Sequence, residues 1–128
     1  MDAFANLLVL VARIFISSFF LWASMKKVMN WTSTVAYMQT KKVPGALVPA
    51  AMLLQIVGGL SVLLGFEARI GALLLIVFII PAAWKLHDFW NVAETEKVSQ
   101  KSLFMKDVAI LGGLLLLLAT GAGRFALN

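Results

Sequence analysis

Four long apolar stretches occupy most of this 128-residue chain, at about residues 4–22, 47–65, 68–86 and 103–120. Each is long enough to cross a hydrocarbon core of roughly 30 Å as a helix, at about 1.5 Å of rise per residue. Hydrophobic residues make up 62% of the chain and charged residues only 13%, which leaves too little polar surface to cover a water-soluble particle. The sequence therefore predicts an all-α integral membrane protein.

The connectors between these stretches are short, so consecutive spans should lie antiparallel and pack as a four-helix bundle. We expect one membrane domain over residues 1–128. The first stretch is expected to be a retained helix rather than a signal peptide, because its leader has no basic residue and Arg13 interrupts its apolar core.

The first and third connectors differ in pattern. In the first, Trp31, Val35 and Met38 recur at helical spacing among polar residues, which predicts a short amphipathic helix lying in the membrane interface. In the third, residues 91–101 are polar without periodicity, which favours a solvated loop.

Basic residues indicate the orientation of the spans. Seven lysines flank the first and third connectors, whereas only Arg69 and Arg124 lie on the opposite side. This asymmetry predicts that these connectors are cytoplasmic and that both termini are not. All four tryptophans fall on the same side, and we interpret them with one lysine as anchors at headgroup level. These interfacial residues are Trp22, Lys27, Trp31, Trp84 and Trp90.

Several classes of function are excluded by composition. The chain has no cysteine and a single histidine, so no disulfide, iron–sulfur cluster or metal site is predicted. Its net charge of +5 is spread over short connectors, which favours contact with anionic lipids over binding of nucleic acid.

Four polar residues stand within or beside the apolar stretches: Arg13, Gln55, His87 and Asp107. A charge at the centre of a span costs roughly 2.5–3.5 kcal/mol on insertion, so Arg13 requires a partner. Gln55 occupies the middle of the neighbouring span and is the predicted partner, whereas Asp107 should point into the bundle toward Arg13, Lys27 or His87. Together the four residues are predicted to line one ligand-binding cavity that opens toward the cytoplasmic half of the bundle.

Five segments along nearly the whole chain resemble the DoxX family of small bacterial inner-membrane proteins. They are Ser24-Met25-Lys26-Lys27, Val43-Pro44-Gly45-Ala46, Gly58-Gly59-Leu60, Leu86-His87-Asp88-Phe89-Trp90 and Phe104-Met105-Lys106-Asp107. The resemblance implies a four-helix bundle in the inner membrane. It also implies kinship with the membrane subunit of a thiosulfate:quinone oxidoreductase and with membrane partners of redox-defence enzymes.

The chain departs from the usual family pattern at two of the predicted site residues. The family usually has Glu where Gln55 stands and Asn where Asp107 stands. If a family carboxylate in the second span balances Arg13, the departure implies that Asp107 supplies the negative charge from the fourth span instead.

Two functional hypotheses follow, and the sequence alone leaves open whether the chain is catalytic. In the first, it is a redox-associated subunit whose polar pocket binds a quinone or a small oxyanion, with no covalent cofactor. In the second, it is a non-catalytic scaffold that anchors a soluble redox or stress-defence enzyme. Either hypothesis admits a protein partner subunit or a homo-oligomer in the bilayer.

Overall fold

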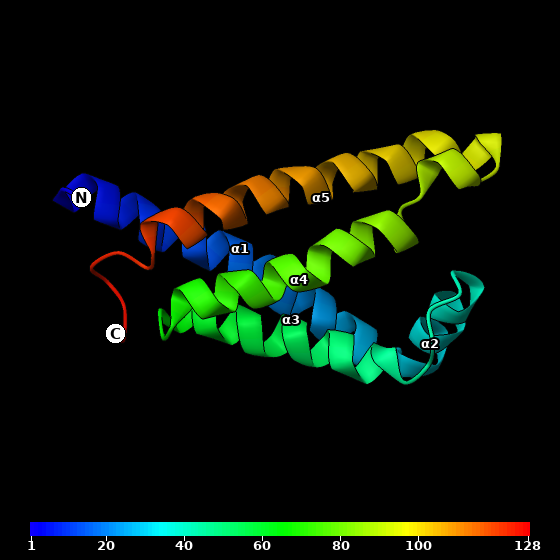
Figure 1. The fold of residues 1–128 in the computed structure, drawn as a ribbon, viewed down its shortest axis with the longest axis horizontal. Coiled ribbons are helices and arrows are strands. Elements are labelled where there is room, and N and C mark those ends of the chain that lie inside the picture. The colour runs from blue at the N-terminus through cyan, green and yellow to red at the C-terminus, as the bar shows by residue number, and fades with distance from the viewer.

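The structure is a computed structural model that describes residues 1–128, and it is built of helices joined by short connections (Figure 1). Its elements are α1 (Ala3–Met29), α2 (Trp31–Thr40), α3 (Leu47–Leu64), α4 (Ala68–Leu86), the 3₁₀ turn η1 (Phe89–Asn91) and α5 (Glu94–Thr120). Helices α1, α3, α4 and α5 are long and apolar enough to cross a membrane. The predicted all-α, four-helix membrane fold is confirmed.

The four long helices form a bundle in which α3 packs against α1 and α4, and α4 packs against α5. Figure 1 shows both termini at one end of the bundle, together with the turn between α3 and α4. This end is called the terminal end below. The opposite end, called the α2 end, carries α2 and the connection from α4 to α5 (Figure 1). The side of the membrane on which each end lies stays a prediction.

Close packing of α3 on α4 depends on two glycines that face each other. A Cβ at Gly58 would lie 2.9 Å from the side chain of Leu75 and 3.0 Å from the carbonyl oxygen of Gly71. Small residues at such crossings let backbones approach where lipid provides little hydrophobic drive between helices. α3 is followed by Gly65, whose φ of 72° is the left-handed conformation that glycine adopts readily and that ends the helix.

The predicted solvated loop at residues 91–101 is wrong over most of its length, because α5 begins at Glu94. Glu94 and Glu96 lie in its first turn, where negative charge is favoured by the helix dipole. Glu94 also pairs with Lys97 at 2.8 Å, one turn along the helix. These local interactions extend the apolar helix outward, although the segment has no hydrophobic periodicity of its own.

The first connector does contain a helix, α2, which is held against the bundle by polar contacts. Tyr37 donates from its hydroxyl to the carbonyl of Leu86 at 2.9 Å, and Lys41 pairs with Asp88 at 2.7 Å. Met38 is buried against the protein. The location of this helix in the membrane interface stays a prediction.

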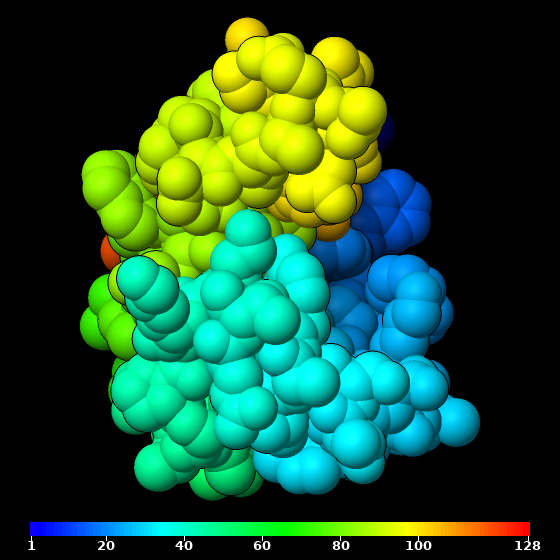
Figure 2. All heavy atoms as spheres, turned by 90° about the vertical axis from the view of Figure 1, so that its right-hand side faces the viewer, coloured from blue at the N-terminus to red at the C-terminus, as the bar shows by residue number.

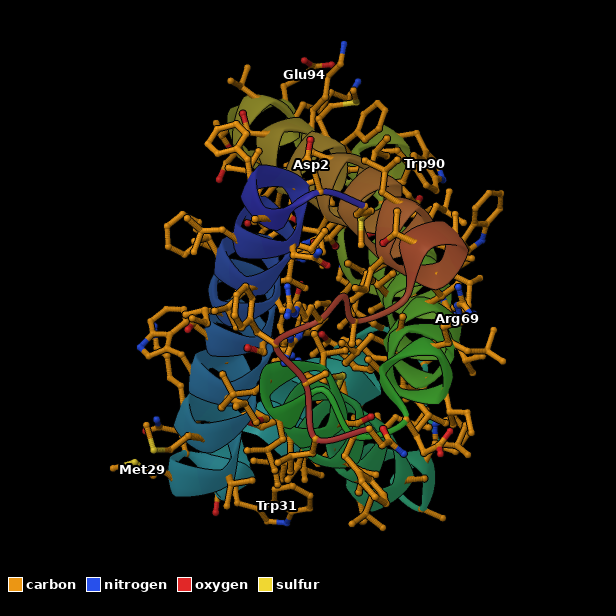
Figure 3. All side chains as sticks on the ribbon, turned by 90° about the vertical axis from the view of Figure 1, so that its left-hand side faces the viewer. Asp2, Met29, Trp31, Arg69, Trp90 and Glu94 are labelled. Carbon is orange, nitrogen blue, oxygen red and sulfur yellow. The ribbon has the colours of Figure 1, made fainter.

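The C-terminal tail, residues 121–128, crosses the terminal end of the bundle, as Figure 3 shows in the view onto that end. Asn128 accepts from the backbone N–H of Glu67 at 2.8 Å and donates to the Glu67 carboxylate at 2.9 Å. The backbone N–H of Arg124 donates to the side chain of Asn6 at 2.9 Å. The tail is therefore tied to both α1 and the turn between α3 and α4.

Candidate functional site

Arg13 lies within α1 and is only 1% exposed, so it faces the interior of the bundle as predicted. Its guanidinium donates four hydrogen bonds to backbone carbonyls: to Val62 at 2.9 Å, Leu63 at 3.0 Å, Ala122 at 3.0 Å and Phe125 at 2.5 Å. The carbonyls of Val62 and Leu63 belong to the last turn of α3, which lacks helical donors and carries the negative end of the helix dipole. Arg13 therefore caps α3 and holds the C-terminal tail.

The predicted hydrogen bond between Arg13 and Gln55 is not formed. α1 continues to Met29 instead of ending near Trp22, so its C-terminal turns lie beside the middle of α3. Lys27 consequently reaches the depth of Gln55. Arg13 lies instead near the C-terminal end of α3.

A cavity of about 550 Å³ opens at the α2 end, and residues from all five α-helices line it. Figure 2 looks onto this end, where α2 in cyan and the connection from α4 to α5 in yellow-green lie one above the other, with part of α1 in blue beside them. Gln55, His87 and Asp107 all line the cavity, whereas Arg13 does not. The structure thus brings together three of the four predicted site residues. The volume lies within the range of small-molecule sites, about 300–1,000 Å³.

His87 and Asp107 form a polar pair in the cavity wall. Nε2 of His87 lies 3.8 Å from Oδ2 of Asp107, whose residue is only 6% exposed. On its other side, Nδ1 of His87 lies 3.0 Å from Oε1 of Gln100. With the amide oxygen of Gln100 accepting, Nδ1 is the donor of this hydrogen bond, which leaves Nε2 on the side of the carboxylate. The pair thus places an imidazole and a carboxylate side by side at the cavity surface.

The same geometry excludes the charge balance that the family resemblance implied for Asp107. Its carboxylate faces His87, the residue that follows α4, and forms no ion pair with Arg13. Backbone carbonyls satisfy Arg13 in place of a carboxylate. Backbone carbonyls therefore stabilise the positive charge of Arg13, and no buried carboxylate is needed.

Lys27 was expected as an interfacial anchor and as one of three possible partners of Asp107, and it lines the cavity together with Gln55. Its ammonium lies 3.5 Å from Oε1 of Gln55, at the upper limit of a hydrogen bond, and 5.2 Å above the centre of the Phe78 ring. Gln55 itself is 1% exposed. Lys27 therefore keeps donor capacity that a ligand can use.

Two further lysines at the cavity lie over aromatic rings in the same manner. Lys26 lies 5.1 Å from the centre of the Trp22 ring, and Lys106 lies 4.7 Å from that of Phe19. Both pairs line the cavity. With Lys27, three lysines and one carboxylate line the cavity, which therefore carries an excess of positive charge.

The position of Lys27 could have been found from the spacing of α1. The buried residues of this helix after Arg13 are Ser17, Phe20 and Ser24, at steps of three and four. The next such step falls on Lys27, so the inward stripe predicts this lysine. The interpretation of Lys27 as an anchor was based on its charge and did not consider its position on the buried face of α1.

The tryptophans interpreted as anchors are all exposed. Trp22 also lines the cavity. Trp84 and Trp90 stack edge to face at 5.5 Å near the connection from α4 to α5, and Trp31 begins α2. Their contact with lipid headgroups stays a prediction.

Comparison with known proteins settles the family. The DoxX family model matches residues 8–88, which is more than half of the chain. The chain belongs to the DoxX family. The matched region contains α3, α4 and most of α1, and so includes Arg13, Gln55 and His87, whereas Asp107 lies beyond it.

Two curated relatives support this membership over nearly the full length. The inner membrane protein YqjF of Escherichia coli strain K12 is 38% identical over 120 residues, covering 94% of this chain and 88% of the relative. The inner membrane protein YphA of the same organism is 30% identical over 123 residues, with the same coverage. No solved structure gives a significant match.

Proposed function

We propose that this DoxX family member is a redox-associated subunit of the bacterial inner membrane that binds the head group of a quinone in the cavity at the α2 end. The observation that carries the proposal is the placement of Lys27. The side chain is partly buried in a cavity of about 550 Å³, and its ammonium has one long hydrogen bond, to Gln55, besides its contact with the Phe78 ring. Such a donor in apolar surroundings is stabilised by an acceptor, and a quinone carbonyl is an acceptor that dissolves in the membrane.

The side chains that line the cavity suit the chemistry of a quinone. Aromatic side chains of Phe19, Phe20 and Phe78 line it and can pack against a flat ring. Lys27 and the amide of Gln55 supply donors on the α1 and α3 side. These groups can orient a carbonyl, while the rings keep water from the rest of the ligand.

A bound quinone would serve as an electron acceptor, and its full reduction to the quinol takes up two electrons and two protons. The His87–Asp107 pair lies in the cavity wall at the α2 end and can pass protons inward from the cytoplasm, on which side we place this end. Gln100 fixes the orientation of the imidazole for this role. Because the chain has no cysteine, electrons reach this site from a substrate or a partner protein rather than from a thiol of this chain.

A small oxyanion is the second candidate ligand, favoured by the excess positive charge of the cavity. Lys26, Lys27 and Lys106 all line it, with Asp107 as the acidic group. An inorganic oxyanion would be held by several ammonium groups at once. A quinone would depend mainly on Lys27 and Gln55.

The test is gentle purification from the native membrane, followed by quantification of quinone in the organic extract and of co-purifying proteins. We expect quinone at close to one equivalent with the wild type and with Lys26→Met, and its loss with Lys27→Met. Added thiosulfate should not displace it. Loss of quinone to thiosulfate would favour the oxyanion, and a stoichiometric protein partner without any quinone would favour the scaffold hypothesis.

A further inference from the structure

A second cavity lies on the outer surface of the bundle, between the end of α2, α3 and α4. It has a volume of about 400 Å³ and is lined mostly by apolar residues. Leu47 and Ala50 of α3 and Val77 and Pro81 of α4 are exposed residues in its wall, so the cavity faces the surrounding lipid. This surface is called the α3–α4 groove below.

The α3–α4 groove is polar only toward one end. Its charged residues are Lys42, in the turn that follows α2, and Lys85, in the last turn of α4. Neither forms an ion pair, because the ion pairs of the protein join Lys41 to Asp88, His87 to Asp107 and Lys97 to Glu94. Two unpaired ammonium groups therefore lie at the α2 end of an apolar groove.

This polarity matches the chemistry of a phospholipid. Val77 precedes Lys85 by about two helical turns, so the apolar wall runs from the lysines toward the middle of the bundle. A basic pocket between transmembrane helices at the membrane surface is the arrangement that binds anionic lipid headgroups. The apolar part of the groove can hold an acyl chain, which argues against inorganic phosphate as the ligand. The two lysines can hold a negative headgroup, which argues against the tail of a quinone.

We propose that the α3–α4 groove is a specific binding site for one anionic diacyl phospholipid, with its phosphate between Lys42 and Lys85 and an acyl chain along Ala50 and Val77. This site is separate from the proposed quinone cavity, although Phe78, Ala82 and Leu86 contribute to the walls of both. A lipid seated there would hold the end of α2 against α3 and α4. The proposal stands whether or not the other cavity binds a quinone.

The experiment is native mass spectrometry of the purified protein after delipidation and back-titration with phosphatidylglycerol or phosphatidylcholine of the same chain length. The wild type is expected to retain one phosphatidylglycerol in clear preference to phosphatidylcholine. Lys42→Gln/Lys85→Gln should lower that preference about thirtyfold, from the attraction of two lysines near a membrane surface. Inorganic phosphate in excess should not displace the lipid.

Two further variants separate the contributions of headgroup and chain. Ala50→Phe keeps both lysines but fills the groove, and it should lose the retained lipid. Lys97→Gln/Lys101→Gln removes the same charge from α5 at the same end, and it should behave as the wild type. The proposal is overturned if the Lys42/Lys85 double variant keeps the wild-type preference, or if Ala50→Phe retains the lipid in full.

Discussion

Replacing Arg13 by methionine tests whether this buried charge is a structural clamp. Methionine keeps much of the length of the side chain but removes all four hydrogen bonds to Val62, Leu63, Ala122 and Phe125. At about 1.5 kcal/mol for each bond from a charged donor, the loss is about 6 kcal/mol. Burying the guanidinium in the folded bundle costs several kcal/mol, about 3 kcal/mol here, and methionine removes that cost. We therefore expect Arg13→Met to lower the free energy of unfolding by about 3 kcal/mol.

The same variant should release the C-terminal tail, which gives a second readout. Trypsin cleaves after Arg124, an exposed residue whose backbone N–H is bonded to Asn6. In detergent, mass spectrometry should show faster removal of the last residues from Arg13→Met than from the wild type. The matched control is Arg69→Met, which removes an exposed guanidinium that donates to the carbonyls of Leu118 and Ala119 in α5.

We expect Arg69→Met to change the free energy of unfolding by less than about 1 kcal/mol, because its bonds are exposed. The two readouts together decide the role of Arg13. If Arg13→Met unfolds within about 1 kcal/mol of the wild type and its tail is cleaved no faster, the clamp does not stabilise the bundle. The reasoning from the four carbonyl contacts would then be refuted.

Three further predictions concern packing, pH and orientation. Gly58→Ala should destabilise the protein by about 1–3 kcal/mol in chemical unfolding, because its Cβ would lie 2.9 Å from Leu75, whereas Gly112→Ala meets nothing within 4 Å and should cost nothing. The pKa of Lys41 is raised by its hydrogen bond to Asp88, so the stabilisation it provides is present below pH about 10.4 and lost as the pH rises through the folded-state pKa. Unfolding of wild type and Lys41→Met should therefore converge at strongly alkaline pH, and a difference that stays constant would contradict this. A periplasm-specific reporter fused to the C-terminus should be active, and activity of a cytoplasm-specific reporter there would show that the orientation is reversed.

The fold was predictable because it depends on long apolar runs, which are visible without any tertiary information. The bounds of α3 and α4 lie within a residue of the predicted spans, since glycine, charge and proline mark their ends. α1 and α5 are longer than their apolar runs, because local capping and ion pairs extend a helix beyond the membrane core. Hydropathy alone does not detect these extensions.

The site was only partly predictable, because depth along each helix was inferred from the apolar runs. α1 extends to Met29, and it packs against α3 in a register that the apolar runs did not indicate. In this register Lys27 lies beside Gln55, where Arg13 had been predicted. The carbonyl partners of Arg13 lie in the last turn of α3 and in the tail, and backbone groups leave no trace in side-chain patterns. The pairing of Asp107 with His87 was among the predicted alternatives, since both residues lie near the same end of adjacent helices.

The most direct test of the proposed function is an equilibrium titration of the purified protein with a short-chain quinone in a lipid nanodisc. The account predicts saturable binding of one quinone to the wild type and to Lys26→Met. Lys27→Met should bind at least tenfold more weakly, because a charge-assisted hydrogen bond contributes about 1.5–3 kcal/mol. Equal affinity of all three proteins, or the absence of saturable binding to the wild type, would contradict the assignment of this cavity as a quinone site.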